Sequence, residues 1–113
     1  VRGDMYLKAG SVWVRYPEPE MEQTMTTLKV RSGQITIVRH GPVRSEQTFR
    51  KGHKSGGYYR MPYGRLELSM QTHDMNVHLR DGIGTIAWSY DLFMDERFSG
   101  TFALKLEIRE DGT

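Results

Sequence analysis

Residues 58–94 read YYRMPYGRLELSMQTHDMNVHLRDGIGTIAWSYDLFM, and apolar side chains alternate with polar ones in three successive runs. A two-residue period places all apolar members of a run on one face of a β-strand. We therefore predict three strands here, with turns at Asp74 and at Asp81-Gly82. The apolar members of the three runs are Leu66, Leu68 and Met70; Met75, Val77 and Leu79; and Ile86, Trp88, Tyr90, Leu92 and Met94.

The flanking sequence continues this alternation between short turn signals. Gly10, Gly33 and Gly41 mark three reversals, because glycine readily adopts the positive φ of a tight turn. The acidic, proline-broken segment 17–23 predicts an exposed connection, and the glycine-rich segment 51–57 predicts a mobile loop. No apolar pattern of helical period lasts beyond a turn, so no substantial helix is expected. About ten short strands are predicted, the others at residues 4–7, 11–16, 24–31, 35–39, 43–50, 58–63 and 98–109.

The predicted strands indicate an all-β fold in which consecutive strands pair antiparallel, because their connections are short. Such a meander protects its edges most simply by closing, so we expect an up-and-down β-barrel of about 8–10 strands, with a sandwich as the alternative. The 113 residues are expected to form one domain, 1–113, with a missing or truncated first strand before Val1. The predicted inward set is Leu66, Leu68, Met70, Val77, Leu79, Ile86, Trp88, Tyr90, Leu92, Leu104 and Leu106.

The charge of this chain is nearly balanced, with sixteen basic and fourteen acidic residues and a formal charge of +2. A nucleic-acid partner is not expected, because such proteins usually concentrate a basic stripe. No apolar run is long enough to span a membrane, so no membrane partner is expected. The absence of cysteine excludes disulfides and thiolate metal sites, and it is compatible with the cytosol.

Three segments of the chain resemble the YwiB-like family of small bacterial proteins. They are Val38 to Phe49 (VRHGPVRSEQTF), Tyr59 to Leu68 (YRMPYGRLEL) and Ile86 to Leu92 (IAWSYDL). The resemblance implies a calycin-like, lipocalin-type β-barrel, a bacterial cytoplasmic location and a domain without an established activity. It brings no catalytic residues. The likeness departs at the start of the chain, where family members carry an additional N-terminal strand before the position of Gly3.

Metal binding and catalysis have weak support in the sequence. His73 and His78 lie five residues apart across the predicted turn at Asp74, so strand alternation should direct them to opposite faces. No metal site, cofactor or catalytic residue is predicted. Tyrosines together with Arg60, Glu67 and Asp91 could line a barrel mouth, which leaves a lyase- or hydrolase-like enzyme as a minor alternative. The tyrosines in question are Tyr58, Tyr59, Tyr63 and Tyr90.

The leading functional hypothesis is a small apolar or amphipathic ligand held inside the barrel, because eight-stranded barrels are just wide enough for one ligand. Ser45 and Gln47 enter the interior if Phe49 does. Together with Thr48, and with Arg39 and Arg44 beside them, they could bind a carboxylate or phosphate at the rim. The alternative is an interaction module with a filled core and sheet edges that pair into a homodimer. The predicted ligand-binding residues are Arg39, Arg44, Gln47, Tyr59, Arg60, Glu67, Trp88 and Tyr90.

Overall fold

The computed structural model describes residues 2–19 and 21–110, and within them nine β-strands account for all the regular structure. No helix in this described part is long and apolar enough to cross a membrane. The prediction of an all-β fold is confirmed. The strands are β1 (Asp4–Lys8), β2 (Ser11–Pro17), β3 (Met25–Arg31), β4 (Gln34–His40), β5 (Arg44–Arg50), β6 (Lys54–Met61), β7 (Gly64–Arg80), β8 (Ile83–Met94) and β9 (Arg97–Ile108).

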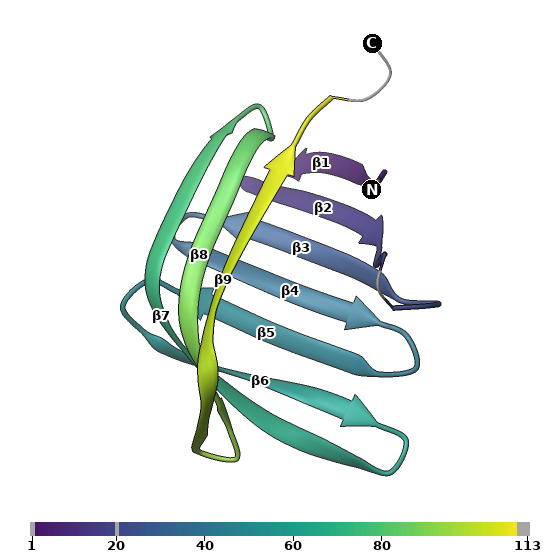
Figure 1. Ribbon diagram of the computed structural model, residues 1–113. Helices are drawn as coiled ribbons and strands as arrows, with labels where there is room; N and C mark the ends of the chain where they lie inside the picture. The colour runs from purple at the N-terminus through teal and green to yellow at the C-terminus, as the bar shows by residue number, and fades with distance from the viewer. Residues whose placement is uncertain (1, 20, 111–113) are drawn as a thin grey trace.

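The strands form a single sheet in sequential order, and each pairs antiparallel with the next. The sheet curls strongly, so that β7, β8 and β9 cross in front of β1 to β5 (Figure 1). We call the space between these two walls the hollow, and the buried core side chains fill much of it. In the described residues β1 and β9 have no hydrogen-bonded partner on their outer edges, and the result is a half-barrel with a seam between them. We call the face toward the hollow the concave face and the opposite one the convex face.

The turn predicted at Asp74 is wrong, because residues 64–80 form one strand of 17 residues. The pairing of β7 with β8 shifts between Thr72 and Asp74, which identifies a β-bulge at His73. One extra residue reverses the alternation, and this explains why the apolar positions change from Met70 to Met75 without leaving the concave face. The bulge region is also tied to the β5–β6 turn, since the Gly52 N–H donates to the Thr72 carbonyl at 2.9 Å.

The mobile loop predicted at residues 51–57 is also wrong in its second half, because β6 begins at Lys54. Gly57 lies directly opposite Gln47 and Leu68 in the sheet. A Cβ at Gly57 would collide with the backbone carbonyl of Glu46. Glycine therefore permits a close approach of two strands here, and it is not a sign of mobility.

The core lies on the concave face of the sheet. Of the predicted inward set, Val77 and Leu104 are 39% and 37% exposed. They do lie on the concave face, opposite Ile86 and Trp88 respectively, but at the end of β7 and on the edge strand β9, where no further strand covers them. Leu66, Leu79 and Leu106 are partly buried against the core. The buried apolar residues are Leu28, Val30, Ile35, Ile37, Phe49, Leu68, Met70, Ile86, Trp88, Tyr90 and Leu92.

Candidate functional site

A row of polar side chains crosses the concave face at one end of the apolar core. Strand pairing places Tyr16 opposite Thr26, Thr26 opposite Arg39, Arg39 opposite Ser45, and Ser45 opposite Tyr59. Directly opposed residues in antiparallel strands point to the same face, so these five side chains line up from β2 to β6. We call them the polar row. The adjacent row includes Leu28, Ile37 and Gln47, which are all buried, and Gln47 is its polar member.

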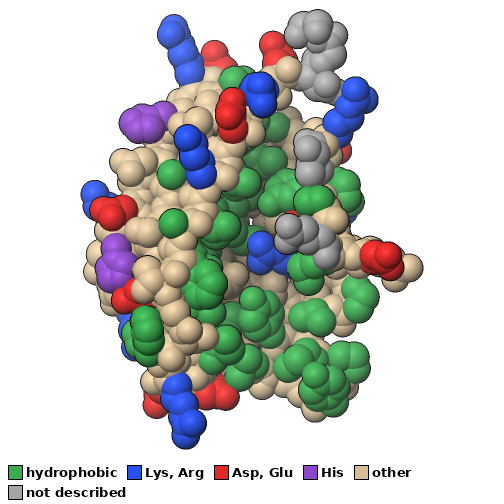
Figure 2. All heavy atoms as spheres, in the orientation of Figure 1, with side chains coloured by type: hydrophobic (Ala, Val, Ile, Leu, Met, Phe, Trp, Pro, Cys, Tyr) green, Lys and Arg blue, Asp and Glu red, His purple; other side chains and the backbone are tan. Residues whose placement is uncertain are grey.

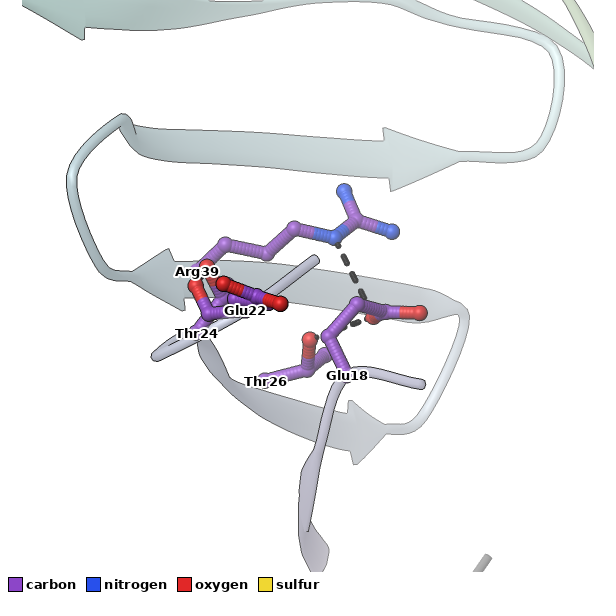
Figure 3. A network of polar contacts seen from close by, with 5 residues as sticks. All are labelled: Glu18, Glu22, Thr24, Thr26 and Arg39. Atoms are coloured by element: carbon purple, nitrogen blue, oxygen red, sulfur yellow. Dashed lines mark hydrogen bonds and ion pairs between the residues drawn. The ribbon is translucent and has the colours of Figure 1, made fainter. Parts of the chain in front are cut away.

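An ion pair stands at the middle of the polar row (Figure 3). Arg39 Nε lies 3.6 Å from Glu18 Oε2, and the Thr26 hydroxyl donates to the same carboxylate oxygen at 2.7 Å. Glu18 belongs to the connection between β2 and β3, where its own N–H donates to the Thr24 carbonyl at 2.8 Å. This backbone bond folds the connection over the concave face and brings the carboxylate to Arg39.

The guanidinium of Arg39 is only partly occupied by this pair. Its side chain is 22% exposed and that of Glu18 is 16% exposed, so water or a solute reaches both groups. Figure 3 shows the Nε edge toward Glu18, with the two terminal nitrogens beyond it. Among the described residues, neither terminal nitrogen makes a hydrogen bond or ion pair. Arg39 therefore retains two donors on the hollow side of the sheet.

Two tyrosines flank Arg39 from opposite walls of the hollow. Burial raises the pKa of Tyr16, and the charge of Glu18 acts in the same direction, whereas Arg39 and a hydrogen bond with Thr26 oppose the rise. Burial likewise raises the pKa of Tyr90 on β8, together with the nearby Tyr59, against a hydrogen bond with Gln47 and the charge of Arg39. Both phenols therefore stay protonated at neutral pH and act as hydrogen-bonding groups.

Aromatic rings line the core beyond the polar row. The Phe49 ring lies 4.6 Å from the Tyr90 ring and 5.5 Å from the Trp88 ring, measured between centroids. The buried Trp88 Nε1 has no hydrogen-bond partner in the described part of the chain. The concave face thus joins an aromatic and aliphatic floor to a hydrogen-bonding row.

A cavity of about 370 Å³ opens at the seam of the half-barrel. Its walls include Met5 on β1, Val14 and Tyr16 on β2, and Leu106 on β9, and Glu18 closes the end nearest Arg39. Figure 2 shows hydrophobic side chains gathered around the hollow, with a basic side chain set among them. The volume falls within the roughly 300–1,000 Å³ of small-molecule sites.

Comparison with known proteins agrees with this architecture. Residues 1–106 match a family described as a domain of unknown function, DUF1934. The chain belongs to this family. It is 30% identical to the uncharacterized beta-barrel protein YwiB of Bacillus subtilis (strain 168) over 95 residues, which are 83% of this chain and 67% of that protein.

The crystal structure of the ywiB protein from Bacillus subtilis superposes with a TM-score of 0.70 at 26% identity. The superposition covers 91% of this chain and 70% of that one. The predicted YwiB-like family and the β-barrel architecture are therefore confirmed. The finer calycin-like assignment stays a prediction.

The eight predicted ligand-binding residues separate onto the two faces. Five lie on the concave face: Arg39, Gln47, Tyr59, Trp88 and Tyr90. Arg44, Arg60 and Glu67 lie on the convex face, where Arg44 opposes Arg60 and Glu67 opposes Tyr58.

Because these residues lie on opposite faces, the polar cluster that the enzyme hypothesis requires does not form. Glu67 pairs with Arg65 on the convex face, whereas Tyr59 and Tyr90 lie on the concave face. Asp91 also faces away from the hollow, toward His73 and Thr101.

The alternation argument for the histidines is overturned by the bulge. His73 and His78 are both exposed on the convex face, because the extra residue at His73 reverses the alternation between them. His73 Nε2 lies 2.9 Å from Asp91 Oδ2. In residues 2–19 and 21–110 no group of three or more histidine, aspartate and glutamate side chains is arranged to hold a metal ion.

Sequence reasoning missed Glu18, Tyr16 and Thr26 as members of the site. Glu18 was missed because Pro17 and Pro19 mark an exposed connection, and no sequence signal shows that this connection folds inward. A signal for Thr26 did exist. It shares its alternation with the buried Leu28 and Val30, so it had to face the core.

Proposed function

We propose that this protein binds one small apolar or amphipathic molecule on its concave face, as a cytoplasmic binding protein. The observation that carries the proposal is the union of an apolar floor, a polar row and a cavity of about 370 Å³ that reaches Tyr16 and Glu18. A ligand with an apolar body and a polar end would find both kinds of surface in one site. The absence of cysteine agrees with the proposed location.

The ion pair gives a second reason to favour binding. A buried or half-buried ion pair usually stabilises a fold no better than well-packed apolar residues would, because both charges lose hydration. Arg39 and Glu18 nevertheless stand beside the apolar core with their charges toward the hollow. A binding role explains these polar groups better than folding stability does.

Native mass spectrometry of the gently purified protein tests the proposal. The expected result is a fraction of the protein that carries one small molecule per chain, which is then released and identified. A clean apo mass, with no uptake of amphiphiles added to the solution, would contradict it.

The two tryptophans offer an optical test with a built-in control. Trp88 faces the hollow and is buried, whereas Trp13 lies on the convex face between Tyr6 and Lys29. A ligand in the hollow should change Trp88 fluorescence alone. The change should therefore persist in Trp13→Phe and disappear in Trp88→Phe.

An interaction module is the second candidate, and the edge of β9 favours it. This strand of twelve residues has no neighbour on its outer side in the described chain, and Phe102 and Leu104 are exposed. Two copies paired antiparallel about Leu106 would set Lys105 of each opposite Glu107 of the other. A dimer mass in the same native spectra, lost in Lys105→Glu and restored when Glu107→Lys is added, would support this module.

A further inference from the structure

We infer that the polar row recognises a carboxylate, so that the ligand is a monoanionic amphiphile with its head on Arg39 and its apolar body in the seam cavity. The inference rests on the proposed function, because it assigns the ligand class of the same site. It adds the chemistry of the head group and the direction in which the ligand lies.

The guanidinium supplies the first argument. Only its Nε edge is directed to Glu18, at 3.6 Å, and the two terminal nitrogens have no hydrogen-bond or ion-pair partner among the described residues. A guanidinium can donate two parallel hydrogen bonds to one carboxylate, and this arrangement is both strong and geometrically selective. The free pair of donors is therefore matched to a planar, two-oxygen acceptor.

The local charge supplies the second argument. Arg39 is the cation of the polar row, and Glu18 on the β2–β3 connection is paired with it, so the pair is close to neutral. Arg39 is already partly neutralised by Glu18. A phosphate head with nearly two negative charges would therefore be attracted weakly by Arg39 and repelled strongly by Glu18. A single negative charge avoids most of this repulsion. The Tyr16 hydroxyl is engaged with Thr26, which itself donates to Glu18, whereas the protonated Tyr90 can accept from the Gln47 amide and donate its own hydrogen bond to such a head.

The cavity supplies the direction of the ligand. Tyr16 and Glu18 line it on the side of the polar row, and Val14, Leu28 and Leu106 form an apolar wall beyond them. Asp4, Glu107 and Arg109 also line it, on the side of β1 and β9. An apolar body that leaves Arg39 would pass along the apolar wall toward the seam between β1 and β9. Burial of apolar area along this path would supply most of the affinity, and the head would supply selectivity.

Titration of the full chain with decanoate and with decanol at neutral pH tests the inference. The two probes share a chain and differ in the head group, and Trp88 fluorescence or calorimetry reports binding. We expect decanoate to bind about tenfold more tightly or better, as for hydrogen bonds to a charged group. Equal affinity would overturn the carboxylate assignment and leave the proposed binding function in place. Binding of neither probe would overturn both.

A matched set of variants locates the preference. Arg39→Gln combined with Glu18→Gln removes both charges together, so it leaves no unpaired charge in the hollow. It should bind decanol as before and lose the preference for decanoate. Arg44→Gln removes a positive charge from the neighbouring strand on the convex face, and it should keep the preference. Loss of the preference in Arg44→Gln alone would show general charge attraction and would overturn the assignment to Arg39.

Discussion

The concave and convex faces of the sheet carry the same trio of arginine, glutamate and tyrosine in very different surroundings. On the concave face Arg39 lies 3.6 Å from Glu18, with Tyr16 nearby. On the convex face Arg65 lies only 2.7 Å from Glu67, and its guanidinium stacks over the Tyr58 ring. The shorter contact is therefore the outer one.

Distance alone does not rank these two ion pairs, because water screens the outer one. The side chains of Arg65 and Glu67 are 55% and 63% exposed, against 22% and 16% for the inner pair. An exposed pair gains little from its contact, since its members are almost as well solvated apart. When a half-buried charge loses its partner, water cannot replace that partner equally well. Burial therefore decides which of the two pairs is costly to break by removing one partner.

The largest expected difference between the faces concerns their phenylalanines. Phe49 is completely buried on the concave face between Trp88 and Tyr90. Phe49→Ala should lower the free energy of unfolding by about 3–5 kcal/mol, through lost burial and a residual cavity. Urea unfolding followed by circular dichroism measures this loss.

The matched control on the convex face is Phe93→Ala. Phe93 contacts Phe98 edge-on and lies under the ammonium of Lys54, both at the surface. Its removal should cost only about 1 kcal/mol. Equal losses for Phe49→Ala and Phe93→Ala would show that the concave face is not the core of this fold.

The second difference separates the two arginines. Arg39→Ala leaves the Glu18 carboxylate half-buried without a cation and should cost about 2 kcal/mol, less than the roughly 3–5 kcal/mol of a fully buried pair. Arg65→Ala should cost less than about 1 kcal/mol. Both values follow from urea unfolding at low and high salt, and only the Arg65 effect should fade in high salt. A larger loss for Arg65→Ala would reverse the ranking by burial.

Much of this fold follows from alternation alone. The pattern of Ile86, Trp88 and Tyr90 predicted β8 and its buried face correctly, and Ser45 and Gln47 enter the interior as the parity of Phe49 required. The order of the strands in the sheet followed from the short connections, because a short connection favours antiparallel pairing of consecutive strands. The same alternation places the concave members of the predicted site, such as Arg39 and Tyr90, on the inner face.

The remaining errors have local physical causes. A bulge adds one residue to a strand without any turn signal in the sequence. The bulge at His73 therefore reverses the alternation of inward and outward side chains, and the predicted opposite orientation of His73 and His78 is wrong. Gly57 lies in a strand because two backbones approach closely there, and this tertiary contact cannot be read from composition. The chemistry of Arg44, Arg60 and Glu67 suits a binding site, but all three alternate with inward-facing residues and therefore lie on the convex face.

The smallest expected effect on stability concerns Asp91, whose carboxylate contacts Thr101 and the bulge residue His73 on the convex face. Hydrogen bonds from Thr101 and then His73 lower the pKa of Asp91 below its ordinary value. A carboxyl group with a depressed pKa in the folded state stabilises the fold above its unfolded pKa and loses that contribution as pH falls through the folded one. The stability added by Asp91 should therefore be present at neutral pH and vanish in acid.

Asp91→Asn tests this sign. The variant should be slightly less stable than the parent protein at neutral pH, and the gap should close as pH falls below about 4. Urea midpoints across this range measure the gap. Asp74→Asn, on the other side of the same bulge, is the control, because Asp74 makes no side-chain hydrogen bond or ion pair in the described part of the chain. If the difference in urea midpoint between Asp91→Asn and the parent stays constant into acid, the Asp91 side chain stabilises the fold through packing and not through its charge. The charges of the convex face, those of Asp91 and Arg65 alike, would then contribute little to stability.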